Sequence, residues 1–80
     1  MATMRAKVRL NSVTVFENNE TLRFNAVARS TTYPADGSDE DNTYAKFSPS
    51  ASFEITVANP DLLGKFHPGE TFYVDFTPAN

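Results

Sequence analysis

The sequence predicts an all-β protein, a small antiparallel five-stranded barrel or sandwich with one short helical turn before the last strand. Apolar and polar residues alternate in several short runs, which is the period of a half-buried strand. Turn-forming Asn, Pro and Gly residues separate those runs. The chain has 80 residues, of which 40% are hydrophobic, so there is room for only one core. We therefore expect a single domain over residues 1–80, with residues 1–3 as a disordered arm.

The first two predicted strands form a long hairpin. Residues 4–10 alternate strictly, and the phase then slips at Asn11 and Ser12, which predicts a β-bulge. The sequence ENNE at 17–20 predicts the hairpin turn, and residues 21–30 predict the second strand. We expect the inward side chains of this hairpin to be Met4, Ala6, Val8, Leu10, Val13, Val15, Leu22, Phe24, Ala26 and Ala28.

The opposite face of the hairpin is predicted to be basic. It carries five of the seven cations of the chain, Arg5, Lys7, Arg9, Arg23 and Arg29. Neighbouring like charges on paired strands repel one another, so we expect a negative partner to neutralise them. Tyr44 and Tyr73 are candidates to lie beside these cations. Three interpretations stay open for this face: a solvent-exposed ladder, a protein-binding surface, or a groove for single-stranded nucleic acid.

Residues 34–42 form the one long predicted loop, which is polar and acidic. Its carboxylates are Asp36, Asp39, Glu40 and Asp41. The order of residues in DGSDEDN does not match a calcium-binding EF-hand loop, which predicts a loop that faces solvent or a partner. Alternatively, the loop supplies the negative charge for the basic face, either within one molecule or in a neighbouring copy.

The rest of the chain supplies three more predicted strands and a corner. The strands cover 43–47, 51–58 and 70–76, with Phe53, Ile55, Val57, Phe72, Val74 and Phe76 among the inward residues. In NPDLLG, Asn59 is suited to a helix N-cap, Pro60 to the first helical position and Gly64 to the C-terminal end, which predicts a single helical turn. Pro68 and Gly69 predict a tight turn into the last strand.

Residue types argue against an enzyme, a cofactor or a metal site. The chain has no cysteine, and its only histidine, His67, has no neighbours at metal-ligand spacing, so we expect it in a surface turn. Glu54 and Asp75 are conceivable as an acid–base pair on neighbouring strands, although such residues usually keep a sheet face soluble. No apolar run resembles a signal peptide or a membrane span, so we expect no membrane partner.

The C-terminal part of the chain resembles a group of small uncharacterised proteins of tailed bacteriophages. The resemblance covers somewhat under half of the chain and rests on a Phe-Ser-Pro-Ser step, an Asn-Pro turn and an ending of the form Phe-x-Pro-Gly-x-x-Phe-Tyr-Val-Asp-Phe. The matching residues are Phe47, Ser48, Pro49, Ser50, Asn59, Pro60, Phe66, Pro68, Gly69, Phe72, Tyr73, Val74, Asp75 and Phe76. Ala51 departs from the glycine expected there. The resemblance implies a phage origin and no catalytic residue.

These observations together predict a non-enzymatic interaction protein. The leading hypothesis is a phage virion accessory of the capsid decoration type, located in the virion or the host cytoplasm. It would bind a capsid protein, another virion protein or its own copies through the basic face, the acidic loop or both. The alternatives are a single-strand binder with an oligonucleotide-binding fold, and a small inhibitor of a host defence enzyme. The formal charge of −3 argues against a nucleic acid as the main partner.

Overall fold

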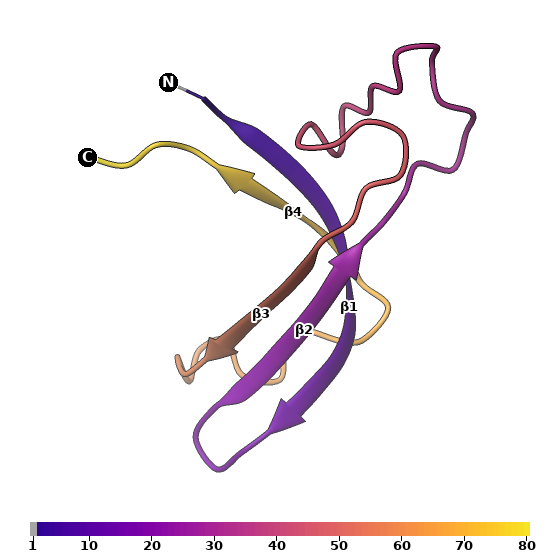
Figure 1. Ribbon diagram of the computed structural model, residues 1–80. Coiled ribbons are helices and arrows are strands. Elements are labelled where there is room, and N and C mark those ends of the chain that lie inside the picture. The colour runs from indigo at the N-terminus through magenta and orange to yellow at the C-terminus, as the bar shows by residue number, and fades with distance from the viewer. Residues whose placement is uncertain (1) are drawn as a thin grey trace.

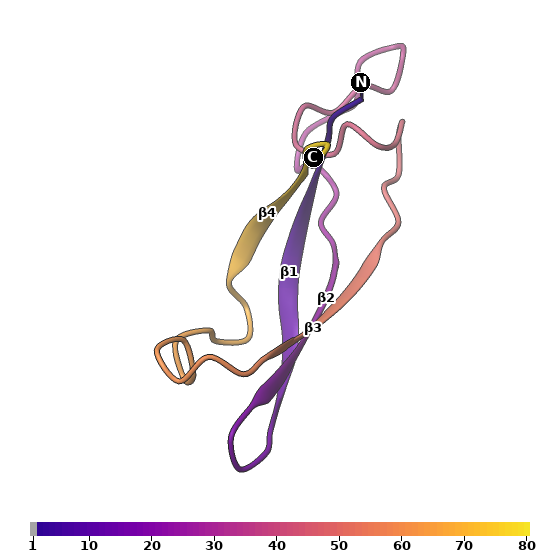
Figure 2. The ribbon, with the colours of Figure 1, turned by 90° about the vertical axis from the view of Figure 1, so that its left-hand side faces the viewer.

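The protein is a single curled sheet of four antiparallel strands, which confirms the all-β prediction. The computed structural model describes residues 2–80. The strands are β1 (Met4–Val15), β2 (Glu20–Ala26), β3 (Ser52–Val57) and β4 (Thr71–Phe76), in the spatial order β3-β2-β1-β4 (Figure 1). No helix occurs within the described residues. The sheet curls into a half-barrel, with β3 and β4 as its edges (Figure 2).

The concave face of the sheet holds the core, as the alternating pattern predicts. Its buried side chains are Ala6, Val8, Leu10, Leu22 and Phe24. Phe24 on β2 links the two edges, because its ring lies 5.6 Å from that of Phe53 on β3 and 5.9 Å from that of Phe72 on β4. Phe66, from the connection between β3 and β4, packs 5.7 Å from Phe72 and covers part of this face.

The predicted bulge in β1 is confirmed. The register between β1 and β2 shifts between Leu10 and Ser12, so Asn11 is the extra residue. Because of this shift Val13 returns to the inner side and packs against the core. Val15 is nevertheless 71% exposed, contrary to the prediction, because it lies beside the hairpin turn, which projects beyond the edge strands (Figure 1).

The predicted strand at 43–47 is wrong, and the second strand ends earlier than predicted. β2 stops at Ala26, so Ala28 lies outside the sheet and is exposed, and residues 27–51 form one long connection. Within that connection Phe47 has a φ of 62°, which is incompatible with an extended strand. The side chain of Asn42 forms hydrogen bonds with the Lys7 N–H on β1 and with the Val27 carbonyl, as described below.

The predicted helical turn is not confirmed, because residues 59–64 form hydrogen-bonded turns and no helix. The Leu62 N–H donates to the Asn59 carbonyl at 2.9 Å, and the Lys65 N–H donates to the Leu62 carbonyl at 3.3 Å. Both bonds span three residues, as in β-turns, and no i to i−4 bond accompanies them. Asn59 caps the Asp61 N–H at 3.0 Å through its side chain, and Gly64 has a φ of 76°.

The corner before β4 is built as predicted. Gly69 adopts a φ of 97°, and the Glu70 N–H donates to the His67 carbonyl at 3.2 Å across the Pro68–Gly69 turn. His67 is exposed, and its N–H donates to Glu70 Oε1 at 2.6 Å. Of the predicted N-terminal arm, Met1 lies outside the described residues, whereas Ala2 and Thr3 precede β1 and are exposed.

Candidate functional site: the charged face and the polar loop

The cations of the first two strands lie on one face, as predicted. Arg5, Lys7 and Arg9 alternate with the buried residues of β1, and Arg23 lies on the same outer face of β2. We call these four residues the charged face. Arg29 does not belong to it, because β2 ends at Ala26. Its guanidinium instead donates to the Ser38 carbonyl at 3.1 Å and to Thr31 Oγ1 at 3.1 Å, which holds the long connection together.

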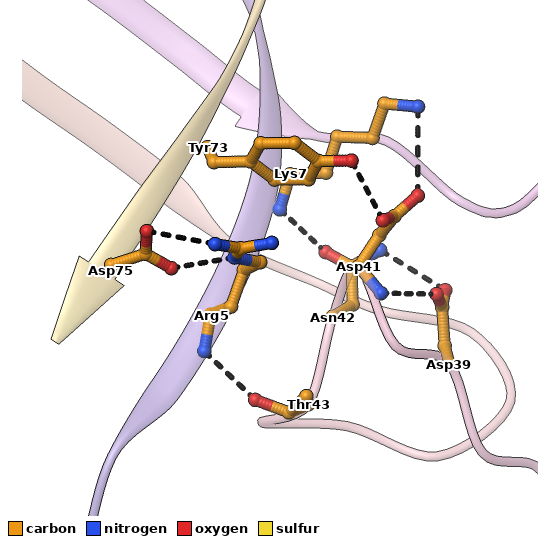
Figure 3. Close-up of polar contacts among 8 residues, drawn as sticks. All are labelled: Arg5, Lys7, Asp39, Asp41, Asn42, Thr43, Tyr73 and Asp75. Atoms are coloured by element: carbon orange, nitrogen blue, oxygen red, sulfur yellow. Dashed lines mark hydrogen bonds and ion pairs between the residues drawn. The ribbon is translucent and has the colours of Figure 1, made fainter.

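Arg5 is neutralised by its neighbour on β4. Its guanidinium donates two hydrogen bonds to the Asp75 carboxylate, at 2.7 and 3.2 Å, and it lies 4.3 Å from the centre of the Tyr73 ring (Figure 3). Arg5 and Asp75 face each other in the register of β1 and β4. The hydrogen bond from Arg5 lowers the pKa of Asp75, and the same bond raises the pKa of Arg5.

Lys7 is paired with residues 34–43 of the connection between β2 and β3, which we call the polar loop and which include the predicted acidic loop. Its Nζ lies 3.7 Å from Asp41 Oδ2, and the Tyr73 hydroxyl donates to Asp41 Oδ1 at 2.8 Å. That hydrogen bond raises the pKa of Tyr73, because it stabilises the protonated phenol. The loop therefore supplies negative charge to the face within one molecule, which is one of the two arrangements the sequence left open. Tyr73 lies beside the cations as predicted, whereas Tyr44 packs against the core.

Arg23 is paired with Glu54 on the neighbouring edge strand, β3. Its Nη2 lies 3.1 Å from Glu54 Oε1 on β3, and its Nη1 donates to Thr14 at 3.1 Å. Both charged side chains are more than half exposed, so the pair contributes little to stability. Arg9 is the only cation of the charged face that forms no ion pair within residues 2–80.

The supposed acid–base pair of Glu54 and Asp75 does not exist. Glu54 is on β3 and Asp75 is on β4, which are the opposite edges of the sheet. Three strand spacings separate the two edges, or about 14 Å along a flat sheet. Each carboxylate is bonded to an arginine, Glu54 to Arg23 and Asp75 to Arg5. The pattern of alternation could not exclude this pair, because it gives the face of each residue and not the order of the strands.

Asn42 is the residue that fixes the polar loop, and it is fully buried. Its Oδ1 accepts the Lys7 N–H at 2.9 Å, and its Nδ2 donates to the Val27 carbonyl at 2.9 Å and to Asp39 Oδ2 at 3.1 Å. Lys7 and Val27 are opposite each other, since the Val27 N–H donates to the Lys7 carbonyl at 2.9 Å. The amide of Asn42 therefore stands between the Lys7 N–H and the Val27 carbonyl and replaces the second hydrogen bond of this pair. Figure 3 shows the bond from the Lys7 N–H to Asn42.

Thr43 continues this replacement along β1. Its N–H donates to the Arg5 carbonyl at 3.0 Å, and its Oγ1 accepts the Arg5 N–H at 2.8 Å. These contacts satisfy the backbone groups of β1 that β2 would otherwise satisfy. No sequence pattern predicts these contacts, because Asn and Thr in a polar loop are ordinary turn residues.

The four predicted loop carboxylates have different surroundings. Asp39 is buried; burial raises its pKa, but the bonds from Asn42 and the Asp41 N–H outweigh burial, so the pKa lies below its ordinary value. Asp36 accepts the Ser38 N–H at 3.0 Å, which lowers its pKa. Glu40 is exposed and forms no ion pair with the residues described. Of the four, only Asp41 bonds to side chains outside the loop, those of Lys7 and Tyr73.

A surface cleft lies where the charged face, the polar loop and the chain ends meet. It has a volume of about 510 Å³ and is lined by Thr3, Met4, Arg5, Glu40, Thr43, Asp75, Phe76 and Thr77. Met4 and Phe76 face each other in the register of β1 and β4, and they are 43% and 49% exposed although both were predicted inward. They lie at the open end of the half-barrel, where nothing in residues 2–80 covers them completely.

A buried carboxylate that the sequence analysis missed fixes the other end of the sheet. Glu20 is 4% exposed and lies on the concave side, opposite Val57. Its Oε1 accepts the Gly64 N–H at 3.3 Å and so ties the turns at 59–64 to β2. The alternation of β2 places Glu20 on the same face as Leu22 and Phe24, and this pattern could have predicted that Glu20 is buried.

Neither a membrane-spanning helix nor a metal cluster is found in the part of the chain that the structure describes. No helix there has the length and apolar character needed to cross a bilayer. No group of three or more His, Cys, Asp or Glu side chains in residues 2–80 could hold a metal ion. Comparison with family models, curated proteins and solved structures found no match to this chain.

Proposed function

We propose that this protein is a non-enzymatic interaction protein that contacts the surface of another protein through the cleft between Met4, Phe76 and the polar loop. The observation that carries the proposal is the pair of exposed apolar side chains, Met4 and Phe76, beside charged Arg5, Glu40 and Asp75. An apolar patch with a charged rim is typical of protein-binding surfaces. Glu40 is exposed and unpaired there, which leaves one charge of this rim available to a partner.

A virion accessory of the capsid decoration type is the specific form that we propose. This part of the proposal is supported by the C-terminal resemblance to tailed-phage proteins, since likeness of fold alone gives no function. A single-strand binder has less support, because Arg5, Lys7 and Arg23 are neutralised within the molecule. An inhibitor of a host defence enzyme, which would use its acidic loop as a mimic of nucleic acid, also has less support, because Asp39 and Asp41 are bonded inside the domain.

Mass spectrometry of purified phage particles tests the virion proposal. The protein should be present in amounts stoichiometric with a structural protein, and its absence from particles would end this proposal. The surface is tested with Phe76→Ala, for which Phe16→Ala is the matched control. Both side chains are exposed, at 49% and 63%, but Phe16 lies in the turn between β1 and β2. Figure 1 shows this turn at the end of the sheet away from the chain termini.

We expect Phe76→Ala to lower the affinity for phage particles that lack this protein by about tenfold, which corresponds to about 1.4 kcal/mol. Phe16→Ala should bind like the unchanged protein. Circular dichroism would establish that both variants keep the sheet. Equal binding of the two variants would show that the cleft is not the contact.

A further inference from the structure

The free edge of β3 is a second surface, distinct from the cleft, and it is built for strand pairing. The Ala26 N–H donates to the Ala51 carbonyl at 3.0 Å, and Phe53 and Ile55 lie opposite Phe24 and Leu22. In an antiparallel ladder, alternate residues bond to the same neighbour. The odd-numbered residues of β3 therefore bond to β2, whereas Ser52, Glu54 and Thr56 direct their N–H and C=O groups to the free edge.

This edge lacks the features that normally prevent strands from pairing. Residues 52–57 contain no Lys, no Pro and no bulge, and their only charged residue, Glu54, is already paired with Arg23. Ile55, in the middle of the strand, lies opposite Leu22 on the concave side and is still 45% exposed. Val74, in the middle of the other edge strand, is instead partly buried against the core. β3 therefore offers apolar surface and free backbone groups together.

We infer that β3 pairs with β3 of a second copy of this chain, in an antiparallel dimer with its two-fold axis at Ile55. Inner residues must pair with inner residues, so the two isoleucines face each other and Phe53 faces Val57 of the second copy. Glu54 then faces Thr56 of the second copy. These residues exchange backbone hydrogen bonds on both sides of the axis, which joins the two sheets into one.

The charges favour this register over the register with its two-fold axis at Glu54. With the axis at Glu54, the two Glu54 carboxylates would face each other directly, which is destabilising. With the axis at Ile55, each Glu54 faces a neutral threonine and keeps Arg23 at 3.1 Å on its own sheet. Lys7 and Asp41, two of the charges considered for contact between copies, are already paired within one molecule. This inference does not depend on the proposed function of the cleft.

Backbone substitution at Thr56 tests the edge. Thr56→Pro removes an N–H that points to the free edge, and it leaves the ladder to β2 intact. Thr56→Ala is the matched control, because it also loses the hydroxyl contact with Thr21 but keeps the N–H. By sedimentation equilibrium, we expect the unchanged protein and Thr56→Ala to be dimers at about 100 μM, and Thr56→Pro to dissociate at least about tenfold more readily.

Disulfide trapping tests the register without relying on the proline variant. The chain has no cysteine, so a single Ile55→Cys substitution gives an unambiguous product. Facing residues of a non-hydrogen-bonded pair have Cα atoms about 4.5 Å apart, which suits a disulfide. Ile55→Cys should therefore cross-link efficiently under mild oxidation, and more so than Glu54→Cys or the β4 control Val74→Cys.

A monomeric unchanged protein at about 0.5 mM, far above a micromolar dissociation constant, would overturn the inference. Dimers that survive Thr56→Pro, or that cross-link best through Val74→Cys, would overturn the choice of β3. Best cross-linking through Glu54→Cys would overturn the register. None of these outcomes concerns binding through the cleft, so the two proposals fail separately.

Discussion

Replacement of Asn42 by alanine should destabilise the domain strongly. The side chain is fully buried and forms hydrogen bonds to the Lys7 N–H, the Val27 carbonyl and the Asp39 carboxylate. Each such bond contributes about 0.5–1.5 kcal/mol net, so the loss of all three costs about 1.5–4.5 kcal/mol. A domain of this size has a free energy of unfolding of roughly 4–12 kcal/mol, so the loss is a large fraction of it.

The free energy of unfolding is measured by urea denaturation followed by circular dichroism. Asn18→Ala, in the exposed hairpin turn, is the control and should change stability by less than about 0.5 kcal/mol. If Asn42→Ala were as stable as the control, the Lys7 N–H and the Val27 carbonyl would have paired directly. That result would refute the conclusion that Asn42 holds the polar loop in place.

Three further predictions concern the loop, the carboxylates and the surface ion pairs. Gly37→Ala should destabilise the loop by about 1–3 kcal/mol, because Gly37 has a φ of 75° and an added Cβ would lie 2.5 Å from the Phe47 ring. The loss should be smaller in a Phe47→Ala background, and an equal loss there would contradict the clash. Stability should fall as the pH drops below 3.8, the ordinary pKa of Asp, because the folded-state pKa values of Asp75 and Asp39 are lower and the unfolded chain binds more protons. Urea titrations of Asp75→Asn between pH 2 and 6 should give a shallower dependence, and an unchanged slope would exclude a contribution from Asp75. Arg23→Ala should cost less than about 1 kcal/mol, since its ion pair with Glu54 is more than half exposed, and thermal melts showing a larger loss would contradict this.

The sequence by itself determined the class of fold, the inward side of each strand, the bulge at Asn11 and the turn at Pro68–Gly69. These features depend on neighbours along the chain, because alternation and turn geometry are local properties. The shared face of Arg5, Lys7, Arg9 and Arg23 followed from the same alternation and is confirmed.

Only the tertiary structure decided the order of the strands and the partners of the charges. Glu54 and Asp75 have similar local patterns, but the topology places them at opposite edges of the sheet. The prediction of a strand at 43–47 was wrong because Thr43 and Asn42 bond to Arg5 and Lys7 of β1, which lie more than 30 positions away in the sequence. Such contacts depend on which distant groups the fold brings within hydrogen-bonding distance, and no local pattern carries that information.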